Sequence, residues 1–342
     1  MDCRADTFSK HKQYIRTKRI LVGSVLCVLL MITAFWRISQ GEWEIPPERV
    51  VHLLSPFLPE TEKSMPDALV VRAVRIPRFA AAVGTGALLA TAGTVLQGLL
   101  SNPLAEPYTL GIAAGAAFGG ALGFFFSSMM ITPMAFLGAL LALWFVNAIA
   151  WKGGGGSSAH MVLAGIVTNA VLSAGVTFLK AIADDRLGAI VLWLMGSMSG
   201  ASVFSAYMVW IAAAVVFIPS LIYGRQLDAV SLGEGHGELL GIDEKRLRLV
   251  LLCAASMATA VAVSFFGIIG FVGLVTPHLI RIIAGPSHRQ LLVYSFIGGG
   301  LLLAVADGAA QFFGELPVGV VTAMVGGPFF CMILMTGKKT AS

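Results

Sequence analysis

Long apolar runs separated by short polar segments dominate the chain. Each run is close to the length of about 20 residues that an α-helix needs to cross a bilayer. The expected helices cover residues 20–38, 79–100, 108–127, 132–151, 159–180, 203–223, 246–265, 268–284, 291–310 and 319–336. The predicted fold class is therefore all-α, a polytopic membrane protein of about ten transmembrane helices. We expect one transmembrane domain over residues 20–336, between short tails at 1–19 and 337–342.

The composition of the chain supports this membrane assignment. Of its 342 residues, 57% are hydrophobic and 12% are charged, whereas soluble domains carry about 25% charged residues. A soluble protein this apolar would expose large greasy patches and aggregate. The first apolar run follows a strongly basic segment, and no small-residue cleavage site comes after it. We therefore interpret this run as a membrane helix and not as a signal peptide.

The distribution of basic residues predicts the orientation of the helices. Lysine and arginine near helix ends mark the cytoplasmic side, and here they gather in the N-terminal tail, after the sixth run and at Lys338 and Lys339. These positions fall on one side if the number of crossings is even. We therefore expect both termini on the cytoplasmic side of a bacterial membrane. The net charge of +5 follows from this topology and does not indicate nucleic acid binding.

Sequence motifs for metal binding and catalysis are absent. The four cysteines are widely spaced and have no paired histidines, so no metal site is predicted. The sequence also lacks a phosphate-binding loop of the form G-x-x-x-x-G-K-[ST] and any recognisable nucleophile motif. The chain is therefore expected to bind no cofactor, to hydrolyse no ATP by itself and not to be an enzyme.

A hexapeptide at residues 102–107 interrupts the helical pattern. It contains two prolines, and its Glu106 is the single charged residue between Arg78 and Lys152. Proline lacks an N–H group and clashes with the preceding turn, so a helix cannot continue through this segment. We expect a helix break at a membrane boundary. Breaks of this kind in transporters line cavities.

Further polar residues stand at the ends of apolar runs or inside them. Arg75 and Arg78 precede the second run on the expected outer side, where they form a rigid cationic prong; anchoring at lipid headgroups is the alternative explanation. Asp307 lies inside the ninth run. An intramembrane acid is a candidate functional group, and pairing with backbone or a neighbouring helix explains it equally well. The other intramembrane polar candidates are Gln97, His278 and Arg281.

The segment at residues 228–243, between the sixth and seventh runs, is polar and rich in glycine. Four glycines punctuate its central part, residues 232–241. A compact, hinged segment on the cytoplasmic side suits the docking of a soluble partner. A passive loop is the alternative interpretation.

Taken together, these motifs resemble those of the FecCD-type permeases, the membrane subunits of type II ABC importers for iron-siderophores, haem and cobalamin. The resemblance runs from about residue 20 to residue 336 and is carried by residues 75–78, 86–97, 102–111, 232–241, 270–281, 307 and 315–319. It implies a homodimer with the pathway along the dimer axis. It also implies two ATPase subunits on the cytoplasmic side, which hold ATP and Mg, and a substrate-binding protein outside.

The resemblance implies roles for particular residues as well. Arg75 and Arg78 would dock the binding protein. The cytoplasmic gate would comprise Asn102, Leu104, Ser157 and Ser158. Coupling to the ATPase would use residues 228–243, chiefly Leu232, Gly233, Glu234, Leu240 and Gly241. Glu106 is then a boundary residue and not a substrate ligand.

One position departs from the family pattern. Gln311 stands where a cobalamin-transporting member carries a third docking arginine. We therefore expect Arg75 and Arg78, or Arg186 outside the fifth run, to carry more of the contact with the binding protein.

The expected function is translocation of an iron(III) complex of the siderophore type by ATP-driven alternating access, because most members handle iron. Cobalamin or haem is the alternative substrate. An ion-driven secondary transporter would carry several buried acids or bases, whereas this chain offers mainly Asp307. A membrane-embedded enzyme would need a catalytic cluster that is not visible in the sequence.

Overall fold

The computed structural model describes residues 2–41, 43–55, 65–154, 157–233 and 235–336. Within these ranges the regular secondary structure is helical, without a strand. The principal helices are α1 (Asp2–Ser39), α5 (Ile76–Leu99), α6 (Ile112–Gly123), α7 (Ser128–Gly154), α8 (Ser158–Ala181), α10 (Val203–Ile222), α13 (Glu244–Phe266), α14 (Val272–Ala284), α15 (His288–Phe312) and α16 (Val318–Thr336). One of them lies at each expected position, so the predicted all-α membrane fold is confirmed.

The helices differ in length. Seven are long and apolar enough to cross a membrane, whereas α6, α14 and α16 are shorter apolar helices. Two of the short helices begin later than expected: α6 starts at Ile112 and α14 at Val272. The residues before each start form non-helical breaks, which are described below.

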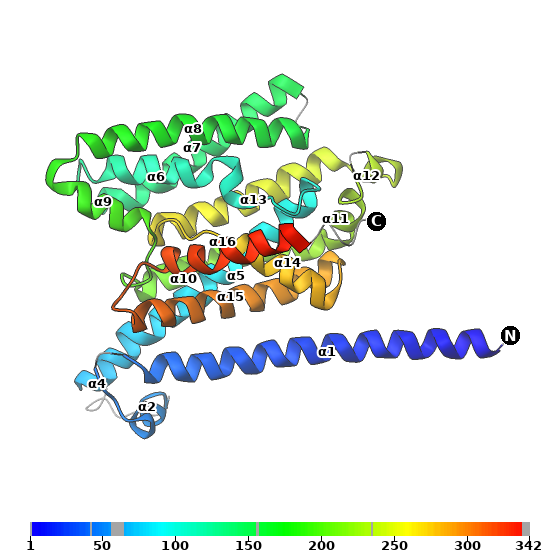
Figure 1. Ribbon diagram of the computed structural model, residues 1–342, viewed down its shortest axis with the longest axis horizontal. Helices are drawn as coiled ribbons and strands as arrows, with labels where there is room; N and C mark the ends of the chain where they lie inside the picture. The colour runs from blue at the N-terminus through cyan, green and yellow to red at the C-terminus, as the bar shows by residue number, and fades with distance from the viewer. Residues whose placement is uncertain (1, 42, 56–64, 155–156, 234, 337–342) are drawn as a thin grey trace.

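The principal helices lie side by side, and the start of α1 and the end of α16 are at the same end of the bundle (Figure 1). We call this the N-terminal end. It also carries α11 (Gly224–Val230) and α12 (His236–Leu239). The opposite end carries α2 (Pro47–Leu53), α4 (Pro66–Leu69) and α9 (Leu187–Leu194).

Helix α5 forms the centre of the bundle. Most of its residues are buried, and it packs against α10, α13, α14 and α15. Two of these contacts depend on glycine: a side chain at Gly86 would collide with the backbone of Gly299 in α15, and one at Gly93 with that of Gly273 in α14. Helix α1 contrasts with α5, because only 6% of its apolar stretch is buried and it packs mainly against α15.

Helix α5 continues without interruption from α4 and a π-helical turn, η1 (Val70–Arg75). Pro77 stands two residues after this turn, at the start of α5. Its ring nitrogen has no N–H to donate, so the regular hydrogen-bond ladder is interrupted there, and the wider turn accommodates the gap. Arg75 and Arg78 thus lie on one continuous helical segment at the opposite end.

Candidate functional site

Four charged side chains meet at the opposite end of the bundle. Arg37 comes from the last turn of α1, Arg78 from α5, Asp307 from α15, and Glu315 from the turn before α16. The guanidinium of Arg78 donates to the Asp307 carboxylate at 2.9 and 3.0 Å and to both Glu315 oxygens at 2.8 Å. Arg37 donates to Asp307 and to the side-chain oxygen of Gln311, each at 2.5 Å. We call these residues the charge network.

Burial explains why each charge in the network lies beside an opposite charge. Asp307 is 1% exposed, and Arg37 and Arg78 are 5% and 8% exposed. A buried charge without a partner is strongly destabilising, and here two cations face two anions. Glu315 differs from the other members, because 35% of its side chain is exposed. Of the two explanations offered for Asp307, pairing with neighbouring helices is therefore the one that the structure shows.

Arg75 lies beside the network, and within the part of the chain that the structure describes its hydrogen bonds go to backbone carbonyls. It donates to the carbonyl oxygens of Ile38 and Ser39 at 2.8 and 3.2 Å, and to that of Trp43. These carbonyls lie at and after the end of α1, where helical partners are missing. The expected cationic prong is wrong in its geometry: Arg75 and Arg78 are both 8% exposed and turn into the protein. Their docking role stays a prediction.

Arg37 is the functional candidate that sequence reasoning missed. It is the basic residue at the end of the first apolar run, and that position alone suggests only an anchor at the membrane surface. Its partners are 270 and 274 residues away in the chain. Arg186, the other proposed contributor, lies in η3 (Asp184–Arg186) with its guanidinium over the Phe125 ring at 5.5 Å.

The break between α5 and α6 reaches further into the protein than expected. The Tyr108 hydroxyl donates to the Ile269 carbonyl at 2.8 Å and accepts from the Ile269 N–H at 3.1 Å. Residues 101–111 are therefore joined to a second break, residues 267–271, between α13 and α14.

Each break precedes a helix that is shorter than a membrane crossing requires. Helix α6 has 12 residues, so at 1.5 Å per residue it covers about 18 Å of a hydrocarbon core of about 30 Å. Non-helical backbone within a membrane is stable only where protein or enclosed water satisfies its polar groups. The assignment of Glu106 as a boundary residue and not a substrate ligand stays a prediction.

The four proposed gate residues are not gathered into one contact. The Asn102 side chain accepts from the Leu104 N–H at 2.9 Å, which stabilises a turn, and Leu104 is 44% exposed. The Ser157 hydroxyl caps the start of α8 by accepting from the His160 N–H at 3.4 Å, and Ser158 is the first residue of that helix. Helix α8 meets the break further along, where Asn169 donates to the Tyr108 carbonyl at 3.2 Å. The gate assignment stays a prediction.

The segment at residues 228–243 exposes apolar side chains at the N-terminal end. Leu232, Leu239 and Leu240 are 70%, 86% and 68% exposed. The Glu244 carboxylate, in the first turn of α13, accepts from the Gly237 N–H at 2.7 Å and holds α12 in place. Gly233, Gly235 and Gly241 have positive φ angles of 130°, 83° and 75°, a conformation that favours glycine. Glu234 lies outside the described residues.

The remaining intramembrane candidates lie on α5 and α14. Arg281 donates to the Gln97 side-chain oxygen at 3.1 Å, and the Gln97 amide donates to the Gly273 carbonyl at 3.3 Å. These bonds tie the second half of α5 to α14. His278 lies one turn before Arg281 on α14 and is half-buried.

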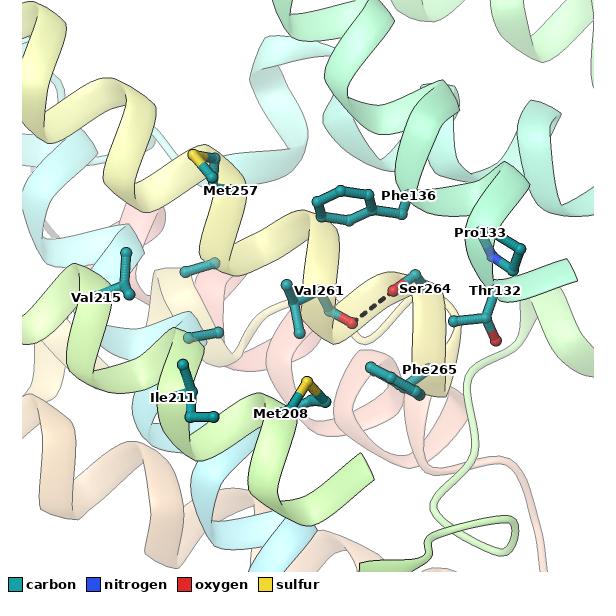
Figure 2. Close-up of a pocket in the computed structure, with 12 residues that line it drawn as sticks. Thr132, Pro133, Phe136, Met208, Ile211, Val215, Met257, Val261, Ser264 and Phe265 are labelled. Atoms are coloured by element: carbon teal, nitrogen blue, oxygen red, sulfur yellow. Dashed lines mark hydrogen bonds between the residues drawn. The ribbon is translucent and has the colours of Figure 1, made fainter. Parts of the chain in front are cut away.

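A crevice of about 370 Å³ lies between α7, α10 and α13 (Figure 2). Its lining is mainly apolar and includes Phe136, Met208 and Met257. The Ser264 hydroxyl at its wall is already bonded to the Val261 carbonyl at 2.9 Å. The crevice therefore suits hydrocarbon and not a polar chelate. Among the described residues, no group of three or more histidine, cysteine, aspartate or glutamate side chains could hold a metal ion.

Comparison with known proteins identifies relatives along nearly the whole chain. The family model for the FecCD transport family matches residues 29–336. The vitamin B12 import system permease protein of Vibrio cholerae is 36% identical over 95% of this chain and 96% of its own length. The hemin transport system permease protein of Yersinia pestis is 39% identical over 79% of this chain and 84% of its own.

A solved structure agrees with these sequence relatives. It is an inward-facing conformation of a metal-chelate type ABC transporter, with a TM-score of 0.81 and 28% sequence identity. The match covers 92% of this chain and 98% of that one.

Proposed function

Because the chain belongs to the FecCD transport family, we propose that it forms the membrane pathway of an importer that takes up an iron(III) complex of the siderophore type. The family consists of ABC transporter permease subunits, and the match to it over residues 29–336 is the observation that carries the proposal. ATP hydrolysis by a separate subunit would drive the change between outward and inward access.

The iron complex is favoured by two of the relatives. The hemin permease handles an iron-containing ligand by its name, and the solved structure belongs to a transporter of metal chelates. Cobalamin is the second candidate, because the vitamin B12 permease matches this chain over almost its entire length.

We assign the N-terminal end of the bundle to the cytoplasm. Arg225, Lys245, Arg246 and Arg248 lie in or next to α11 and the start of α13, and basic residues favour the cytoplasmic side. The exposed leucines of residues 228–243 would then meet an ATPase subunit. A second copy of the chain would complete the pathway, with Asn102, Leu104, Ser157 and Ser158 at its cytoplasmic gate.

The opposite end would receive the substrate-binding protein. Arg75, Arg78 and Arg37 are concentrated there, so an acidic partner surface is favoured by charge. Since all three guanidinium groups are engaged within the chain, docking would require a rearrangement of the charge network or a contact with its edge at Glu315.

The proposal is tested by reconstituting the chain in proteoliposomes with its ATPase and binding protein. We expect ATP-dependent uptake of a ferric siderophore, with hemin and cobalamin as competing substrates measured in parallel. Uptake of cobalamin alone would replace the substrate and keep the importer class. Uptake driven by an ion gradient without the ATPase would contradict the importer itself.

A further inference from the structure

We infer that Asp228 and His288 form a joint that transmits movement of residues 228–243 to the end of α5, next to the proposed gate. The inference rests on the proposed function, because it assigns a positioning role within coupling to the ATPase. It is carried by a set of contacts at the N-terminal end that involves α11, α15 and α5.

The first contact joins α11 to α15. One oxygen of the Asp228 carboxylate accepts from the His288 backbone N–H at 2.7 Å and lies 2.8 Å from the ring Nδ1 of His288. His288 is the first residue of α15, and the preceding Ser287 provides no side-chain cap. Asp228 therefore supplies from another helix the carboxylate that a helix start favours. Movement of α11 would pull directly on the start of α15.

The second contact joins His288 to α5. The ring is buried, with His288 4% exposed, and its Nε2 has no hydrogen-bond partner among the described residues. A Cβ atom placed on Gly98 would lie 2.5 Å from this Nε2. The ring thus presses on the α5 backbone at a position where only glycine leaves room. Gly98 precedes the proposed gate residue Asn102 by one helical turn.

A third contact runs in parallel. The Ser101 hydroxyl donates to the Val230 carbonyl of α11 at 3.4 Å. Leu227 and Val230 of α11 are 0% and 2% exposed, so α11 is seated firmly against the bundle. Densely packed elements shift as units and do not deform continuously. The displacement of α11 by a partner on the exposed leucines would therefore reach the end of α5 and the first residue of the break after it.

The test uses the full transporter with its ATPase in proteoliposomes. Asp228→Ala removes both bonds to His288, and His288→Asn places an amide near the former Nδ1 but removes the ring atoms that face Gly98. We expect both variants to assemble with the ATPase, which co-purification measures, and His288→Asn, outside residues 228–243, to keep its basal ATP hydrolysis. The amount of substrate transported per ATP should fall about fivefold or more, the lower range of typical coupling effects.

A measurement at the proposed gate distinguishes a loss of transmitted movement from a general loss of stability. The substitution Leu104→Cys is made in a background whose native cysteines are replaced. In the parent, ATP with vanadate should change the labelling rate of the introduced cysteine by a membrane-impermeant maleimide; in both variants this change should be lost. Tyr294→Phe is the matched control, because it removes a bond from α15 to the Arg19 carbonyl at the same end and leaves the bonds of Asp228 and His288 in place.

The outcomes are distinct. Normal transport per ATP in His288→Asn would show that the contact with Gly98 does not transmit the movement. An equal loss of transport per ATP in Tyr294→Phe would contradict a specific role for Asp228 and His288. If Asp228→Ala does not assemble, Asp228→Asn and a double variant with His288→Asn replace it: non-additive losses support the joint, and additive losses contradict it. Absence of transport in the parent protein with every substrate would instead contradict the proposed function.

Discussion

At the scale of single residues, Arg78 shares one guanidinium between two carboxylates in different surroundings. Asp307 is 1% exposed and also receives a bond from Arg37, whereas the Glu315 side chain is 35% exposed and stands in a turn with a φ of 60°. The two carboxylates should therefore contribute unequally to stability. Neither the pairing nor its inequality could be read from the sequence, because positions 78 and 307 are 229 residues apart and only the packing of α5 on α15 brings them together.

Arg78→Gln should cost more stability than Glu315→Gln. Removing Arg78 leaves the buried carboxylate of Asp307 with one cation, and breaking a buried pair costs about 3–5 kcal/mol. Removing the charge of the more exposed Glu315 should cost about 1 kcal/mol or less. Unfolding of the purified chain in detergent measures both free energies. Equal losses would contradict the inferred difference in burial.

Glu315→Gln should also strengthen the attraction of an acidic binding protein. The variant leaves the charge network with one excess positive charge, whereas Arg78→Gln leaves one excess negative charge. Binding of the cognate protein to the reconstituted transporter should tighten in the first variant and weaken in the second, and the difference should shrink as salt rises. Unchanged affinity in both variants would show that the charge network does not contribute to docking of the binding protein.

Acidification should weaken the network through Glu315. The hydrogen bonds from Arg78 lower the pKa of the Glu315 carboxyl, burial opposes this shift, and Arg37 also contributes in the lowering direction. A pKa that is lower in the folded than in the unfolded chain gives a stabilisation that is complete above the unfolded value, about 4.3. It is lost as the pH falls through the folded value. We therefore expect the difference in thermal stability between the wild type and Glu315→Gln to become smaller as the pH falls from about 5 to about 3. Thermal unfolding of both proteins across this range measures it.

At the scale of elements, the positions of the ten principal helices could be predicted and the depth of the breaks could not. Apolar length places each helix to within a few residues, except at the start of α1, which is helical from Asp2 although the sequence predicts a tail over residues 1–19. The starts of α6 and α14 depend instead on a tertiary contact, because Tyr108 bonds to Ile269, which is 161 positions away, and on Phe271, which adopts a φ of 67° without being glycine. The roles of the gate and docking residues stay predictions, since their partners are other chains.

Tyr108→Phe tests the link between the two breaks. Loss of the hydroxyl would leave the N–H and C=O groups of Ile269 without this partner, and an unsatisfied buried polar group costs about 1–3 kcal/mol. We expect lower stability in detergent and faster amide hydrogen exchange around residues 267–272. Tyr207→Phe is the matched control, because Tyr207 is 66% exposed on α10 and should change stability by less than about 0.5 kcal/mol.

At the scale of the whole molecule, apolar side chains are exposed at the N-terminal end in a segment that lies between the membrane-length helices α10 and α13. Leu232, Leu239 and Leu240 belong to this group. Leu239→Asp should weaken binding of the ATPase subunit at least about tenfold, which corresponds to about 1.4 kcal/mol. Leu54→Asp, at the opposite end with 41% exposure, is the control and should leave ATPase binding unchanged. Co-purification and titration of the ATPase measure the effect, and equal binding by both variants would contradict the assignment of this surface.

The charge network also has a consequence for the order in which the protein is made. The ribosome delivers Arg37 some 270 residues before Asp307, so during synthesis α1 and α5 enter the bilayer with cations that have no acidic partner yet. Long basic side chains can wait at the membrane surface, and domains form as the chain emerges. The first helix would therefore stay mobile among the lipids until α15 has been synthesised and Asp307 can pair with Arg37. The packing of α1 on the bundle would then be completed only late in synthesis.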